Sequence, residues 1–146
     1  MQPAMQLNYW AVLAAMAAAI VIGFLWYGPI FGKAWMKEMG MSPDQKPGPG
    51  VMQRAMILMV IGSLLTAAML ALGVEMWRLS DWRLGPSAPS ATYGFFAAFF
   101  TWIGFYVPLL FGAVAWENRS WKLFGINAGY HFVSLQAMGV ILAHWR

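Results

Sequence analysis

The sequence predicts an all-α fold, an integral membrane four-helix bundle built of two similar helical hairpins. Four windows contain no Asp, Glu, Lys or Arg, and they cover residues 1–32, 55–74, 84–116 and 123–145. A spanning helix needs about 20 mostly apolar residues to cross about 30 Å of hydrocarbon, and each window is long enough. Only 10% of the residues are charged and 61% are hydrophobic, whereas soluble domains carry about 25% charged residues. We therefore expect a single transmembrane domain over residues 1–146.

We expect the helices at residues 9–31, 52–74, 92–115 and 121–144. No basic residue precedes Lys33, and the first apolar run is longer than the core of a signal peptide, which favours a retained first span. Residues 40–50 contain three prolines and three glycines, which predicts a loop before the second helix. A charged turn then separates the third helix from the fourth.

Basic residues are distributed unevenly between the two ends of these helices. The loops after the first and third helices carry Lys33, Lys37, Lys46, Arg54, Arg119 and Lys122. The opposite end carries Arg78, Arg83 and Arg146. Because loops rich in Lys and Arg stay cytoplasmic, we expect a multi-pass protein of the bacterial inner membrane with both termini on the outer, periplasmic side.

Aromatic and charged residues mark both predicted membrane boundaries. An interfacial belt is expected from Tyr9, Trp10, Trp77, Trp82, Tyr93 and Trp145 on the outer side, and from Trp26, Tyr27, Trp35, Trp116 and Trp121 on the inner side. The boundary charges are expected to form solvated ion pairs, and they are Glu75, Arg78, Asp81, Arg83, Glu117 and Arg119. The net charge is +4, but its basic residues stand singly, which favours membrane lipids over nucleic acid as partners.

The two halves of the chain share a motif at the ends of the first and third helices. The order aromatic, Tyr, x, Pro, then Phe-Gly, then Ala-Trp occurs over residues 26–35 and again over residues 105–116. A weaker repeat links the second and fourth helices, which both begin near a basic residue and end in Trp-Arg. A duplicated hairpin would place the symmetry axis along the membrane normal.

Four residues of this motif are expected to shape the helices. A proline inside a helix removes a backbone donor and clashes with the carbonyl four residues earlier, so Pro29 and Pro108 predict kinks or helix ends at matching depths. Gly32 and Gly112 lack side chains and would allow another backbone to approach. A packing role is the simpler interpretation, and a gate is the alternative.

The run NYWAVLAAMAAAIVIGFLWYGPIFGKAWMKEMG, residues 8–40, resembles the signature of the domain of unknown function 1761 family, with LWYGPIFGKAW as its core. The segment LFGINAGYHFVSLQAMGVILAHW, residues 123–145, is similar to the closing helix of that family. The resemblance implies a small bacterial four-helix membrane protein. It implies no activity and no functional residues.

A polar stripe on the predicted fourth helix is the candidate ligand site. Asn127, His131 and Ser134 fall on one face at 100° per residue, with Tyr130 beside them. An ionisable residue near the bilayer centre is by default a functional hypothesis. The stripe would bind a hydrophobic cofactor, namely haem, a chlorophyll-type pigment, a quinone or a lipid. The alternative is hydrogen bonding between helices that only fixes their packing.

The sequence identifies no cofactor, no metal site and no catalytic constellation. His144 lies too far around the helix from His131 to share a metal with it, and there are no cysteines. We therefore expect a non-enzymatic accessory or assembly subunit. Rows of small residues would pack it against itself, as a homo-oligomer, or against a larger membrane complex. A small oligomeric transporter or channel, or a protein that binds a cofactor near His131, is the alternative.

Overall fold

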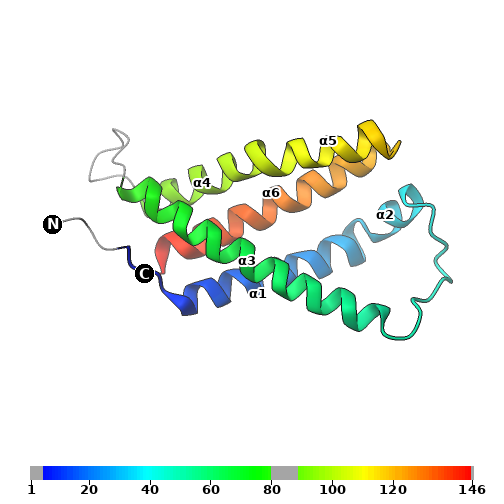
Figure 1. Cartoon of the computed structure of the whole chain (residues 1–146), viewed down its shortest axis with the longest axis horizontal. Helices are drawn as coiled ribbons and strands as arrows, with labels where there is room; N and C mark the ends of the chain where they lie inside the picture. Colours follow the sequence, from blue (N-terminus) through cyan, green and yellow to red (C-terminus); the bar gives the residue numbers. More distant parts are fainter. Residues whose placement is uncertain (1–4, 80–88, 146) are drawn as a thin grey trace.

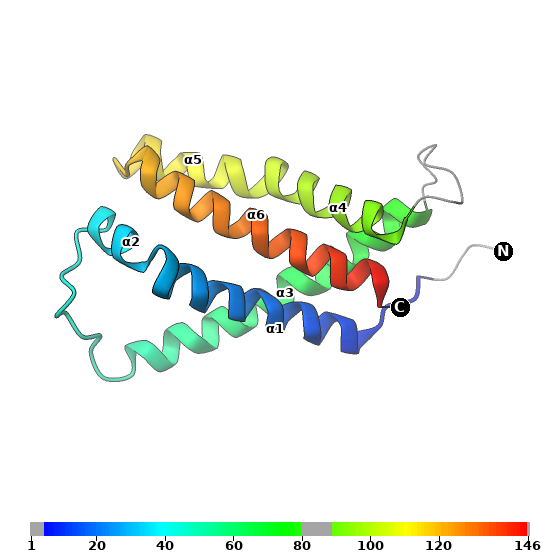
Figure 2. The same ribbon diagram turned by 180° about the vertical axis from the view of Figure 1, so that it is seen from behind.

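The computed structural model of the chain describes residues 5–79 and 89–145, which form a bundle of helices (Figures 1 and 2). The elements in order are α1 (Tyr9–Leu25), η1 (Trp26–Ile30), α2 (Gly32–Glu38), α3 (Val51–Leu79), α4 (Ser90–Thr101), η2 (Trp102–Tyr106), α5 (Val107–Trp116) and α6 (Trp121–His144), where η denotes a π-helical turn. Within these two ranges no β-strand occurs.

Four continuous helical stretches are long and apolar enough to cross a membrane: Tyr9–Ile30, Val51–Leu79, Ser90–Trp116 and Trp121–His144. The predicted all-α membrane bundle is therefore confirmed, and the chain is a multi-pass membrane protein. The fourth helix has the predicted bounds, whereas α3 continues past residue 74 to Leu79 and the short helix α2 follows the first span. The helix α3 continues because Glu75 and Arg78 pair with each other, as described below.

Side chains outside the helices cap the first and last spans. The Asn8 Oδ1 accepts hydrogen bonds from the backbone N–H groups of Trp10, at 2.9 Å, and Ala11, at 3.3 Å. The Ser120 Oγ accepts one from the N–H of Leu123, at 3.1 Å. These caps satisfy donors that the first turn of a helix leaves without a partner, and they fix where α1 and α6 begin.

The main cluster of buried residues lies in the half of the bundle that contains the start of α1 and the end of α6. Both views show α6 between α1 on one side and α4 and α5 on the other (Figures 1 and 2). Buried small residues line the contacts in this closed half, and they include Ala11, Ala15, Ala97, Ala98 and Ala143. Small residues let helices approach closely, which is how membrane bundles gain van der Waals contact.

The other half of the bundle, here called the open half, is less closely packed, although Leu123, Ile126 and Ala128 of α6 are buried there. No residue of α3 from Val51 to Thr66 is buried, and both views show this part of α3 turning away from α5 and α6 (Figures 1 and 2). The π-helical turns η1 and η2 lie in this open half and contain no buried residue. The helices of this half therefore leave spaces between them.

The two motif prolines lie in different positions relative to the π-helical turns. Pro29 lies inside η1, where the Phe31 N–H donates to the Trp26 carbonyl at 2.7 Å, and the helix breaks at Phe31 before α2. Pro108 is the second residue of α5, directly after η2 and inside the continuous helix Ser90–Trp116, and this helix continues to Trp116. A π-helical turn thus lies at each motif, and only Pro29 is followed by a break in its span. Kinks at matching depths stay a prediction.

The closest backbone approach involves glycines outside the motif. A Cβ on Gly139 would lie 2.5 Å from the Gly94 carbonyl oxygen, and a Cβ on Gly94 would be closer still to the Gly139 oxygen. Gly112 has no such neighbour within 4 Å, because it lies in the open half. A Cβ on Gly32 would meet the Tyr27 carbonyl oxygen of its own span. Within the described residues no other helix approaches Gly32 or Gly112, so the close approach of another backbone there stays a prediction.

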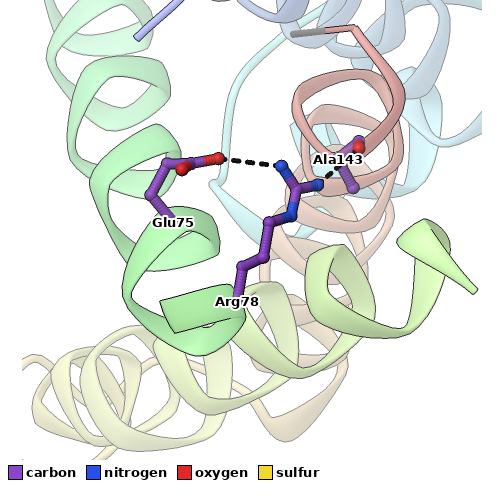
Figure 3. A network of polar contacts seen from close by, with 3 residues as sticks. All are labelled: Glu75, Arg78 and Ala143. Carbon is purple, nitrogen blue, oxygen red and sulfur yellow. Dashed lines mark hydrogen bonds and ion pairs between the residues drawn. The ribbon is translucent and has the colours of Figure 1, made fainter. Parts of the chain in front are cut away.

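A buried polar network joins α3 to the end of α6 (Figure 3). The Arg78 Nη1 lies 2.9 Å from the Glu75 Oε1, and the Arg78 Nη2 donates to the Ala143 carbonyl at 2.7 Å. Glu75 is only 5% exposed. The prediction of a solvated pair is wrong for these two residues, because the Arg78 side chain turns between the helices instead of toward water. Asp81 and Arg83 lie outside the described residues.

Several predicted belt residues also pack inside the bundle. The Trp77 ring stacks on Phe96 and Phe100, with ring centroids 5.5 and 5.3 Å apart. The Trp26 Nε1 donates to the Ile126 carbonyl at 3.0 Å. Other members are exposed as expected, among them Tyr9, Trp10, Trp116, Trp121 and Trp145. Trp82 lies outside the described residues.

Candidate functional site

A cavity of about 260 Å³, here called the central cavity, lies between α1, α3, η2 and α6. Its polar lining consists of Ser63, Thr66, Tyr106, Tyr130, His131 and Ser134, and Met59 and Met138 are among its apolar neighbours. Three of the four residues of the predicted stripe, Tyr130, His131 and Ser134, therefore line one space. The fold brings them together with polar residues of α3 and η2.

The His131 imidazole is the one side chain among these lining residues that carries nitrogen atoms. Its ring lies 4.5 Å from the Tyr106 ring and 4.9 Å from the Tyr130 ring, measured between centroids. Its nitrogens make no hydrogen bond to any residue in the described ranges. A neutral imidazole both donates and accepts one hydrogen bond, so the site offers two unused positions to a bound molecule.

Hydroxyl groups around His131 hold the cavity wall together. The Thr66 and Tyr106 hydroxyls lie 3.2 Å apart and join α3 to η2. The Tyr130 hydroxyl donates to the Ala19 carbonyl at 3.4 Å and joins α6 to α1. The Ser134 Oγ is buried and makes no hydrogen bond of normal geometry to a described residue. It is a further group that a molecule in the cavity can satisfy.

A second space of about 430 Å³, here called the mouth cavity, lies between α2, α5 and α6. Its lining includes Glu117 and Arg119 at one end and Asn127 and His131 at the other. The Asn127 Oδ1 accepts a hydrogen bond from the Tyr27 hydroxyl at 2.8 Å. Asn127, the fourth residue of the predicted stripe, thus faces the mouth cavity, and His131 contacts both spaces.

The comparison with protein families assigns the chain to one of them. Residues 10–143 match the family model described as protein of unknown function (DUF1761). The chain belongs to the DUF1761 family. No curated protein and no solved structure matches the chain. The match includes the motif at residues 26–35 and the whole polar stripe, so the resemblance seen in the sequence is confirmed and both cavities lie within the family region.

Half of the polar side chains that line the central cavity of this DUF1761 protein were not among the predicted site residues. Ser63 and Thr66 lie three residues apart on α3, and this spacing places them on one helix face. The reasoning that singled out His131 would have found them, because they are polar residues inside an apolar span. Tyr106 carried the same signal, because it lies inside the apolar window 84–116 and belongs to the motif at residues 105–116. Among the described residues no group of three or more His, Cys, Asp or Glu could hold a metal ion.

The Tyr27–Asn127 contact gives a first test of the site geometry. Replacement of Tyr27 by Phe is expected to lower the free energy of unfolding by about 1 kcal/mol, since a hydrogen bond between membrane helices contributes about 0.6–1.7 kcal/mol. Tyr9→Phe is the control, because Tyr9 is 77% exposed. Thermal unfolding in mild detergent measures the difference. Equal midpoints for the two variants would contradict the assigned contact.

Proposed function

We propose that this DUF1761 protein is a non-enzymatic membrane protein that binds a small amphipathic molecule, with the polar group of that molecule hydrogen-bonded to His131. The observation that carries the proposal is the His131 imidazole, which lines the central cavity and has no hydrogen-bond partner among the described residues. The buried Ser134 Oγ beside it also has no hydrogen-bond partner among the described residues. A bound molecule that hydrogen-bonds to either group gains about 0.5–1.5 kcal/mol for each bond.

The lining favours an uncharged head group. The central cavity contains hydroxyls and one imidazole, and no carboxylate or basic side chain is among its lining residues. Its volume of about 260 Å³ is below the roughly 300–1,000 Å³ of pockets that hold whole drug-sized ligands. A single ring or a small polar head fits, whereas a haem or chlorophyll-type macrocycle does not. A quinone or an uncharged lipid head is the best match among the expected cofactors.

The mass of the molecule that co-purifies with the protein tests the proposal. The wild type, purified in mild detergent and released into the gas phase, is expected to carry a molecule of defined mass. His131→Ala is expected to lose most of it, by about tenfold in occupancy, which equals about 1.4 kcal/mol of binding free energy. The mass separates a quinone from a lipid.

His144→Ala is the matched control, because His144 is the other histidine of the chain and lies at the end of α6, exposed. It should retain the molecule. If His131→Ala stays folded and retains the molecule as the wild type does, the proposal is wrong. A larger hetero-complex in the same mass spectrum would instead favour the accessory or assembly role. A homo-oligomer whose absorption spectrum shows no chromophore would leave the transporter or channel alternative open.

We also propose that the protein lies in the bacterial inner membrane with both ends of the chain on the outer side. Six basic residues stand in the loops after the first and third helices, and such loops stay cytoplasmic. The start of α1 and the end of α6 lie at the same end of the bundle (Figure 1). Of the three basic residues expected on the outer side, Arg83 and Arg146 lie outside the described residues.

A further inference from the structure

We propose that the central cavity is accessible from one face of the membrane, the face of the loop at residues 39–50 and of the turn between α5 and α6, and is sealed toward the face of the termini. The inference rests on the proposed function only in giving the cavity a ligand. The new element is the face of the membrane from which that ligand, or water, enters the central cavity. Three features of the bundle support it.

The first feature is the chain of spaces in the open half. His131 lines both the central cavity and the mouth cavity. The mouth cavity extends to Glu117 and Arg119 in the charged turn before α6. His131 lies ten residues after Trp121, the first residue of α6, and a rise of 1.5 Å per residue makes that distance about 15 Å. A molecule at the level of this turn therefore has a path to His131 through existing space.

The second feature is the packed core between His131 and the face of the termini. Leu135, Met138 and Leu142 of α6 are 1%, 3% and 6% exposed. Leu70 and Val74 of α3 are 3% and 1% exposed. From His131 to Ala143 this packed section of α6 is about 18 Å long at 1.5 Å per residue. Apolar side chains at this density exclude water from half the thickness of the bundle.

The third feature is the polar network at the end of this core (Figure 3). Arg78 bonds both the Glu75 carboxylate and the Ala143 carbonyl, and its guanidinium carbon lies 5.8 Å from the centre of the Tyr93 ring. It thus joins α3, α4 and α6 at one point. The space beside Glu75 is only about 10 Å³, which is roughly the volume that one water needs. The network closes the bundle where the core ends.

A lateral entry from the lipid is the competing route. A groove of about 480 Å³ between α3, α4 and η2 shares Thr66 and Tyr106 with the central cavity, and a space of about 500 Å³ between α1, η1 and α3 shares Met59 and Tyr130 with it. The hydroxyls of Thr66 and Tyr106 are hydrogen-bonded to each other at 3.2 Å. This contact holds α3 against η2 at the point where the groove and the central cavity meet. We assign entry to the mouth cavity because, of these spaces, it is the one lined by the charged turn before α6.

Labelling of single cysteines tests the route directly, because the chain contains no cysteine. Ser63→Cys places a thiol in the central cavity with little change in volume, at a position that is only partly buried. Ser42→Cys marks the open face and Gln6→Cys marks the face of the termini, since both positions are exposed. The full-length variants are reconstituted in vesicles, and a charged, membrane-impermeant methanethiosulfonate is added to one side at a time. The thiolate is the reactive species, so reaction requires water at the sulfur.

Ser63→Cys is expected to react from the side on which Ser42→Cys reacts, at least about tenfold faster than from the side of Gln6→Cys. Ala71→Cys, within the packed core at 5% exposure, should react from neither side until the protein is denatured. Reaction of the Ser63→Cys thiol from the Gln6 side, or from both sides, would overturn the inference. Reaction only with a lipid-soluble maleimide would also overturn it, because it would show lateral entry. This result is independent of ligand mass, so the proposed function can fail while one-sided access holds.

Discussion

Gly94→Ala is expected to cause one of the two largest losses of stability among single substitutions in this protein. The added Cβ would meet the Gly139 carbonyl oxygen, which is backbone and cannot turn aside. The helices α4 and α6 would have to separate, and the buried contacts around them would be lost with that movement. Overpacked sites lose about 1–3 kcal/mol, occasionally more, and we expect about 3 kcal/mol here. Unfolding of the reconstituted protein, followed by circular dichroism, measures it.

Gly125→Ala is the matched control for this prediction. Gly125 lies on α6, as Gly139 does, but a Cβ there meets nothing within 4 Å. Alanine is favoured over glycine in a helix by about 1 kcal/mol, so this variant should be as stable as the wild type or more stable. If Gly94→Ala proves as stable as Gly125→Ala, α4 and α6 are not in backbone contact.

Arg78→Met is expected to have an effect of similar or greater size. It removes the cation that lies 2.9 Å from the Glu75 carboxylate, which is 5% exposed. Removal of one partner of a buried ion pair costs about 3–5 kcal/mol. The variant also deprives the Ala143 carbonyl of its donor. The free energy of unfolding should therefore fall by about 3–5 kcal/mol, measured as for Gly94→Ala.

A double variant and a surface pair distinguish a buried charge from general damage. Glu75→Gln combined with Arg78→Met leaves no charge at either position, and it should recover a large part of the loss. Arg119→Met should cost less than about 1 kcal/mol, because the Arg119 and Glu117 side chains are 36% and 65% exposed and 3.8 Å apart. Equal losses for Arg78→Met and Arg119→Met would show that the network is solvated.

Charge-free windows predicted the helices well because the cost of burying a charge in hydrocarbon is a local property of the chain. The fourth helix, residues 121–144, has the predicted bounds. The second extends past residue 74 because Glu75 and Arg78 pair across one turn of α3, and a pair of opposite charges does not end a helix. A count of charged residues cannot distinguish such a pair from two solvated charges.

The candidate site was predictable in part, for the same reason. Helical periodicity places Asn127, His131 and Ser134 on one face of α6. Periodicity does not say which other helix faces them, so the approach of Thr66 and Tyr106 required the structure. The separation of α3 from α5 in the open half was also not predictable, since residues 51–66 are as apolar as a packed span would be. The division into two halves therefore follows from tertiary packing alone.

A crystal structure of the wild-type protein grown in lipid tests the central claim most directly. We expect a non-protein molecule in the central cavity, with a polar atom about 3 Å from a ring nitrogen of His131, the distance of an ordinary hydrogen bond. The residues from Leu135 to Leu142 should remain packed against α3. A cavity that holds only water or an acyl chain, or an α3 that closes over His131 and fills the space, would contradict the account.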